Sequence, residues 1–195
     1  MSDSYRVLVV CTGNICRSPF AERLLRARLD ERFGPDATSI EISSAGTWGL
    51  VGEPMMPEAA ETLRRYGGDP ANFAACALDE QQIEAADLVL GLTREHRAAV
   101  VTMVPRASAR TVTIREYARL LSGLSPSELP IAGLDLTERF RVVTRTAFGR
   151  RGFAPPHDPS DDDVPDPFGG PMAAYERAAA LIDRALAVPL SLLSV

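Results

Sequence analysis

Apolar positions along the chain follow two spacings in turn, one typical of strands and one typical of helices. Tyr5–Val10 is a short, valine-rich run that predicts a buried strand. Ser18–Phe33 carries apolar side chains at helical spacing among charged ones, and Gly34-Pro35 ends that pattern. The same reading predicts further strands at Ser39–Ser44, Asp87–Leu92 and Thr111–Ile114, and further helices at Pro57–Tyr66, Asp79–Ala86, Thr93–Val101, Arg115–Leu121 and Tyr175–Val188.

Strand–helix alternation of this kind predicts parallel strands joined by right-handed crossovers. Four strands give the α/β class: a small doubly wound parallel sheet with helices on both faces. Ligands of such sheets bind beyond the carboxyl ends of the strands. The chain of 195 residues fits one domain, residues 1–195. The Pro- and Asp-rich stretch 122–163, with a helix predicted at Leu134–Gly149, is interpreted as an insertion.

Composition narrows the range of functions. The net charge of −5 leaves no basic excess for general nucleic-acid binding. No run reaches the roughly 18 apolar residues that a membrane span needs, and Met1–Arg6 lacks the order of a signal peptide. The cysteines are Cys11, Cys16 and Cys76, an odd and sparse set without zinc-ligand spacing, which suits a reducing compartment. We therefore expect a soluble, cytoplasmic protein that contacts neither nucleic acid nor a membrane.

The chemistry is concentrated in the loop that follows the first strand. It reads Cys11-Thr12-Gly13-Asn14-Ile15-Cys16-Arg17-Ser18 and leads directly into a helix. Gly13 and Asn14 tolerate the backbone angles of a sharp turn. Such a turn can direct several N–H groups and the helix amino terminus at one anion, and the planar guanidinium of Arg17 grips two phosphate oxygens.

A cysteine in that position is expected to be an ionised nucleophile for phosphoryl transfer, with Ser18 as a hydrogen-bond donor to the sulfur. The competing interpretation is a small buried core residue, which is the usual fate of a cysteine at a strand end. A nucleotide-binding loop of the G-x-x-x-x-G-K-[ST] type is absent.

At this point the sequence resembles a known family. The segment Leu8–Glu22 resembles the signature of the low-molecular-weight protein tyrosine phosphatases, and Ser43–Thr47, Ala86–Leu90 and Asp166–Gly170 are similar to three later segments of that family. The resemblance implies the phosphotyrosine phosphatase I-like fold. It also implies hydrolysis of phosphotyrosine in proteins without a metal or cofactor.

The resemblance implies a role for each matching residue. Cys11 would attack phosphorus and become a phosphocysteine, Arg17 would hold the equatorial oxygens, and Asp166 would protonate the phenolic oxygen and later activate water. Ser44 would support the loop from the neighbouring strand, and Cys16 would form a reversible protective disulfide with Cys11. The residues implied to bind phosphate or support its loop are Thr12, Gly13, Asn14, Ile15, Cys16, Ser18 and Ser44.

The acid and the pocket walls are assigned less directly. Asp166 is preferred because Phe168, Gly169-Gly170 and a terminal helix follow it as in the family; its rivals are Asp158, Asp161, Asp162 and Asp163. Phe168 is expected to form one wall of an aryl-binding pocket, with Trp48 and Leu50 as candidates for the other.

Two positions depart from the family pattern. Phe73 and Cys76 stand where many members have His and Arg, and such a His can help to hold the loop asparagine. His96 and His157 are interpreted as surface residues. Two other functions stay open: an arsenate reductase of the same fold, and a phosphotyrosine-binding module without catalysis. The oligomeric state stays open as well.

Overall fold

The structure is a computed structural model that describes residues 4–194. Met1–Asp3, part of the segment assessed for a signal peptide, lie outside that range. Within it, four parallel strands form one sheet in the order β2-β1-β3-β4. The strands are β1 (Tyr5–Cys11), β2 (Ile40–Gly46), β3 (Leu88–Gly91) and β4 (Thr111–Thr113). The predicted fold class is confirmed.

Strand register brings three carboxyl ends to one edge of the sheet. Cys11 at the end of β1 pairs with Gly46 at the end of β2, and Val10 pairs with Gly91 at the end of β3. The strand order reverses at β1, so loops leave in opposite directions from this point. Doubly wound sheets bind their ligands in the crevice that such a reversal opens.

The helices match the predicted ones with small shifts at their ends. They are α1 (Arg17–Phe33), α2 (Pro57–Arg65), α3 (Glu80–Ala85), α4 (Arg94–Met103), α5 (Ile114–Leu121), α6 (Leu136–Gly149) and α7 (Met172–Leu192). The largest shift is in α7, which begins directly after Pro171 and continues past Val188 through Pro189. Proline is well tolerated just before or at the start of a helix, which explains the earlier beginning.

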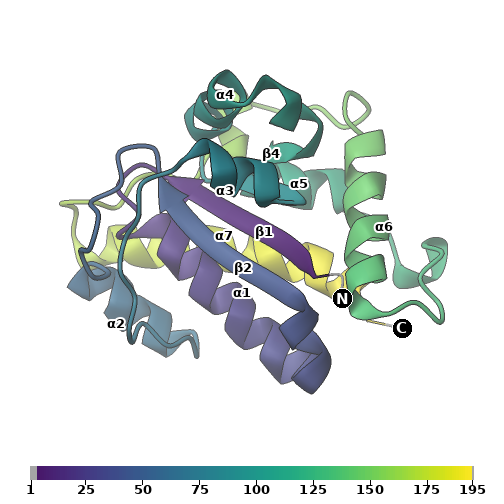
Figure 1. The fold of residues 1–195 in the computed structure, drawn as a ribbon, viewed down its shortest axis with the longest axis horizontal. Helices are drawn as coiled ribbons and strands as arrows, with labels where there is room; N and C mark the ends of the chain where they lie inside the picture. The colour runs from purple at the N-terminus through teal and green to yellow at the C-terminus, as the bar shows by residue number, and fades with distance from the viewer. Residues whose placement is uncertain (1–3, 195) are drawn as a thin grey trace.

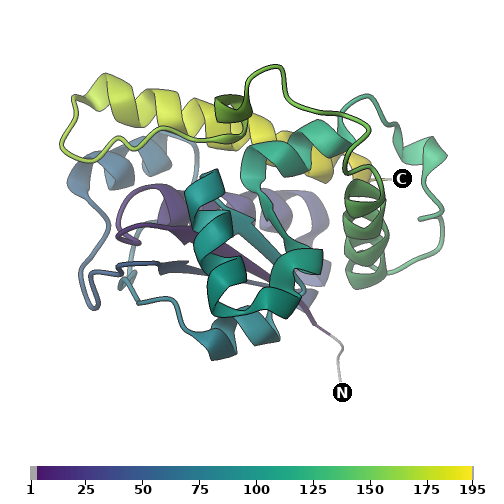
Figure 2. The same ribbon diagram turned by 90° about the horizontal axis from the view of Figure 1, so that it is seen from above.

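Alternation along β1 divides the core between the two faces of the sheet. Val7 and Val9 belong to the cluster that includes the apolar faces of α1, α5 and α7, whereas Leu8 and Val10 pack with Ile83 of α3 and residues of α4. Figure 2 shows α7 on one side of the sheet and α3 on the other. Because β1 is covered on both faces, its residues from Val7 to Cys11 form a continuous apolar run.

Helix α6 lies in the stretch interpreted as an insertion and covers the amino end of the sheet, away from the strand carboxyl ends (Figure 1). Its Phe140 ring lies 5.2 Å from the ring of Tyr5. Its Thr144 hydroxyl lies 2.7 Å from the Tyr5 hydroxyl and 3.0 Å from that of Tyr117. The division into one domain with an insertion at 122–163 stays a prediction. None of the helices described is long and apolar enough to cross a membrane.

Candidate active site

The loop after β1 is fixed by hydrogen bonds to its carbonyl groups. Four backbone N–H groups from the segment after β2 donate to these carbonyls over 2.9–3.0 Å. The donor and acceptor pairs are Thr47 to Cys11, Trp48 to Thr12, Leu50 to Gly13 and Met56 to Ile15. In a trans peptide the C=O and the following N–H point in opposite directions. Carbonyls held on the outer side therefore turn the following N–H groups of the loop the other way, as an anion nest requires.

Asn14 holds the bend of this loop. It is fully buried and has a φ of 56°, a left-handed conformation that asparagine adopts more readily than most residues. Its Nδ2 donates to the hydroxyls of Ser18 (2.9 Å) and Ser44 (2.8 Å), and its Oδ1 accepts from the backbone N–H of Cys76 (2.9 Å). Three hydrogen bonds therefore stabilise the strained residue.

The hydrogen bonds at Asn14 continue in two directions. Ser18 Oγ lies 2.9 Å from Cys11 Sγ, and because it accepts from Asn14 its own proton is available to the sulfur. Ser44 Oγ donates to the Glu22 carboxylate over 2.5 Å. Burial raises the pKa of Glu22, and this short bond acts in the opposite direction. Glu22, which sequence reasoning did not single out, thus ends a chain of contacts that begins at Cys11.

Phe73 and Cys76 make contacts that differ from those expected of a His and an Arg. The Phe73 ring lies beneath the Arg23 guanidinium, 5.6 Å from centroid to Cζ. The backbone N–H of Cys76 holds Asn14, the part that a His can take in members of the family that the sequence resembles. The Cys76 thiol donates to the carbonyl of Ser44 over 3.1 Å.

Arg17, at the first position of α1, is only 4% exposed. Its Nη1 donates to the carbonyl of Val164 (3.0 Å) and its Nη2 to the carboxylate of Asp166 (2.6 Å). Its Nε has no hydrogen-bond partner among residues 4–194. The segment that carries Asp166 is therefore attached directly to the guanidinium.

Geometry separates Asp166 from its rivals. Asp162 pairs with Arg119, and Asp163 pairs with Arg94. Asp158 caps a short 3-10 helix, Pro159–Asp162, and the carboxylate of Asp161 in that helix accepts a hydrogen bond from the backbone N–H of Asp158. These four carboxylates make their contacts away from the loop after β1. Of the five candidates, only Asp166 contacts Arg17 at the end of that loop.

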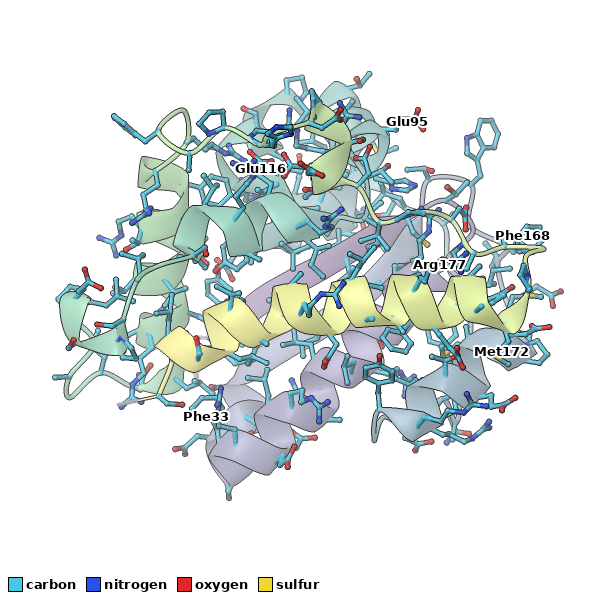
Figure 3. The ribbon with its side chains drawn as sticks, turned by 180° about the vertical axis from the view of Figure 1, so that it is seen from behind. Phe33, Glu95, Glu116, Phe168, Met172 and Arg177 are labelled. Atoms are coloured by element: carbon cyan, nitrogen blue, oxygen red, sulfur yellow. The ribbon has the colours of Figure 1, made fainter. Side chains whose placement is uncertain are left out.

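A cavity of about 210 Å³ opens at this point. It is lined by Cys11, Thr12, Gly13, Ile15, Cys16, Arg17, Trp48, Leu50, Asp166 and Phe168. Phe168 lies at the tip of the segment that precedes α7 (Figure 3). Trp48, 81% exposed, and Leu50 come from the segment that binds the loop carbonyls. The predicted wall residues thus come together, while Asn14, Ser18 and Ser44 lie behind the lining.

The interpretation of His96 as a surface residue is wrong. Its side chain is buried, with Nε2 3.0 Å from Thr12 Oγ1 and Nδ1 2.8 Å from Thr93 Oγ1. Burial, followed by the nearby Arg17 cation, lowers the pKa of His96 to about 4. The sequence contained one part of the signal for this placement, because His96 lies in the first turn of the helix that follows β3. The other part, the pairing of β3 with the strand that ends at Cys11, comes from the structure.

Cys16 is a buried free thiol, as is Cys11, and Cys76 is a half-buried one. Burial, followed by the neighbouring Cys11 and Asp166, raises the pKa of Cys16 to about 12. The Cys16 thiol is therefore protonated at neutral pH. Its disulfide with Cys11 stays a prediction. Within residues 4–194, no group of three or more His, Cys, Asp or Glu side chains is arranged to hold a metal ion.

Comparison with known proteins identifies the family of this chain. Residues 6–123, more than half of the chain, match the family described as low molecular weight phosphotyrosine protein phosphatase. The chain is 36% identical over 111 residues to the low molecular weight protein-tyrosine-phosphatase Etp of Escherichia coli K12, covering 57% of this chain and 70% of that protein. It is 28% identical over 184 residues to the protein-arginine-phosphatase of Geobacillus stearothermophilus, covering 92% and 93%.

The solved structures agree. The low molecular weight protein tyrosine phosphatase from T. tengcongensis superposes with a TM-score of 0.63 and 31% identity, covering 93% of this chain and 97% of that one. The chain therefore belongs to the low molecular weight phosphotyrosine protein phosphatase family and is a phosphatase.

Proposed function

We propose that this protein hydrolyses phosphotyrosine in proteins through a phosphocysteine at Cys11. The observation that carries the proposal is the meeting of a thiol, a guanidinium and a carboxylate in one cavity: Cys11, Arg17 and Asp166 all line it. Apart from these groups the lining is largely apolar, from Ile15, Leu50, Trp48 and Phe168. Walls of this kind suit an aromatic ring more than a short alkyl ester.

In the first step the Cys11 sulfur attacks phosphorus, and the bond from phosphorus to the phenolic oxygen breaks. Asp166 gives its proton to that oxygen, so tyrosine leaves neutral. Arg17 and the loop N–H groups stabilise the charge on the three equatorial oxygens. Ser18, 2.9 Å from the sulfur, makes the thiolate a better leaving group later in the cycle.

In the second step a water attacks the phosphocysteine. Asp166, now ionised, takes a proton from that water, the sulfur–phosphorus bond breaks, and the sulfur leaves with the electron pair. Inorganic phosphate is released, and Asp166 is again protonated, so the enzyme returns to its starting state. The cycle needs no redox partner and no cofactor, and Arg17 supplies the positive charge.

A second candidate substrate is phosphoarginine, because the relatives similar over nearly the whole chain include a protein-arginine-phosphatase. A phosphorylated guanidinium carries several N–H donors, which are costly to bury against apolar walls without acceptors. The described lining contains one carboxylate, Asp166, which the proposed mechanism already uses. The pocket therefore favours the phenyl ring.

A panel of peptides that differ only in phosphotyrosine, phosphoserine or phosphoarginine tests the proposal in buffer with a metal chelator. We expect release of phosphate from the phosphotyrosine peptide, and none from any peptide with Cys11→Ser. Preference for the phosphoarginine peptide would reassign the substrate. Binding without turnover would favour a phosphotyrosine-binding module, and turnover of arsenate coupled to a thiol reductant would favour an arsenate reductase.

The proposal places the enzyme in the cytoplasm. Cys11 and Cys16 line the same cavity, and a reducing compartment keeps such thiols free. The partner implied is a tyrosine-phosphorylated protein.

A further inference from the structure

His96 is a buried side chain that none of the proposed catalytic steps uses, yet it contacts the residue next to the nucleophile. Its Nε2 lies 3.0 Å from the hydroxyl of Thr12, which directly follows Cys11 and lines the cavity. It is only 5% exposed. A buried imidazole is expected to have both nitrogens hydrogen-bonded, and here both contacts are to threonine hydroxyls.

The other nitrogen is held by the fold. Thr93 caps the amino end of α4: its hydroxyl accepts from the backbone N–H of His96 over 3.3 Å and lies 2.8 Å from Nδ1. The imidazole is therefore fixed at one end by the cap of α4 and presents the other end to Thr12. Because α4 follows β3, this places a rigid element beside the loop that follows β1.

Thr12 is thereby held both at its backbone and at its side chain. Trp48 donates its backbone N–H to the Thr12 carbonyl over 2.9 Å, and His96 contacts the Thr12 hydroxyl. Arg17 Nη2 lies 3.5 Å from the same hydroxyl. A neutral imidazole carries one N–H and one lone pair, and in either tautomer it fixes the direction of the Thr12 side chain.

The loop then has two supports of different kinds. Asn14, Ser18 and Ser44 hold its far side, in the network that ends at Glu22. We propose that His96 is a positioning residue of the active site, which holds Thr12 and with it the start of the phosphate loop against α4. This inference rests on the proposed function for its kinetic effect, but the contact itself can be tested independently.

The chain offers a matched pair of substitutions. The terminal amide of glutamine reaches about as far as Nε2 of histidine, whereas that of asparagine ends near Nδ1. His96→Gln therefore keeps a group that can contact Thr12, and His96→Asn keeps the contact to Thr93 but loses the one to Thr12. Thr12→Val removes the hydroxyl from the other side, and the exposed His157→Gln serves as a control.

We expect the inhibition constant of inorganic phosphate and the KM for p-nitrophenyl phosphate to rise about 3- to 10-fold in both His96→Asn and Thr12→Val, the range of one neutral hydrogen bond. The double variant is expected to add little to either single one. His96→Gln should lie closer to the wild type. Values within twofold of the wild type in both His96→Asn and Thr12→Val, or fully additive effects, would overturn the proposal.

A second measurement keeps the test separate from the proposed function. The chain has two histidines, so their ring ¹⁵N signals are simple to assign by NMR. Thr12→Val should shift the Nε2 signal of His96 and leave His157 unchanged; an unchanged His96 signal would overturn the contact. If His96 responds and the variants weaken phosphate binding, but no ester is hydrolysed, the proposed function fails and the positioning role stands.

Discussion

The carboxylate of Asp166 lies 2.6 Å from Nη2 of Arg17, so the proposed proton donor and the proposed phosphate-binding cation are in direct contact. Arg17 is buried, whereas the Asp166 side chain is 47% exposed. In this pair the guanidinium is shielded from solvent and the carboxylate is accessible to it. In the proposed mechanism Asp166 leaves the guanidinium to reach the leaving-group oxygen, while Arg17 keeps its hydrogen bond to the carbonyl of Val164.

Asp166→Asn is expected to slow turnover of a poor leaving group by about 10²–10⁴-fold, the usual contribution of a general acid. Phenyl phosphate, whose leaving group needs the proton, should be affected more than p-nitrophenyl phosphate. Asp158→Asn is the control, because Asp158 caps a 3-10 helix and contacts Ser160. Measurement of kcat for both esters decides the matter. Equal slowing by the two variants would contradict the assignment of the acid.

Asn14 is predicted to contribute more to the free energy of unfolding than its side-chain hydrogen bonds alone account for. Its replacement leaves the buried N–H of Cys76 without its partner and removes two further hydrogen bonds. Asn14→Gly should therefore lower the free energy of unfolding by about 2 kcal/mol. Asn14→Ala should lower it further, by roughly 0.5–1 kcal/mol, because alanine disfavours the φ of 56°.

Urea unfolding of the two Asn14 variants gives the comparison, with kcat/KM measured alongside. An alanine variant more stable than the glycine variant would show that the backbone conformation carries no strain. Loss of stability without loss of kcat/KM would show that the loop keeps its shape without the amide.

The sequence was most informative where local patterns determine structure. The valine-rich run at β1, followed directly by Cys11 and the loop, identified the strand, its carboxyl end and the group expected there. Parallel strands then required that this loop lie at the edge where ligands bind. Local spacing was sufficient because these residues are neighbours in the chain.

The contacts that sequence reasoning missed join residues far apart in the chain. Thr12 and His96 meet because β1 and β3 are adjacent in the sheet, and Glu22 reaches Ser44 because α1 packs on β2. No spacing along the chain encodes such a distance. A polar residue in the first turn of a helix after a central strand is the clue that identifies His96, once the strand order is known.

The hydroxyl cluster at the opposite end of the sheet gives a prediction about stability alone. Thr144 lies between the hydroxyls of Tyr5 and Tyr117, and both tyrosine side chains are buried. Thr144→Val conserves volume but leaves two buried hydroxyls without this partner, which should cost about 2 kcal/mol or more. Because α6 lies far from the cavity, KM and kcat should stay those of the wild type. Denaturant unfolding and a kinetic assay of the same sample test both parts.

The buried His96 predicts acid sensitivity of the fold. Its pKa is about 4 in the folded protein, lowered by burial and by Arg17 and raised in part by Asp166 and Asp163. In the unfolded chain its value is about 6.5. Between these values the unfolded state binds more protons, so the contribution of His96 is complete above about pH 6.5 and is lost as the pH falls towards 4. The loss between pH 7 and pH 5 should be about 2 kcal/mol.

His96→Gln removes this titration and should flatten the fall in unfolding free energy over that interval, whereas His157→Gln should keep the wild-type slope. The slope of the variant has to be compared with the slope of the wild type, because Glu22 affects stability in the opposite direction. The raised pKa of Glu22 favours the folded state as the pH falls. Urea titrations at several pH values from 4 to 7 give the slopes. A His96→Gln slope equal to that of the wild type would mean that His96 accepts a proton in the folded protein as easily as in the unfolded one.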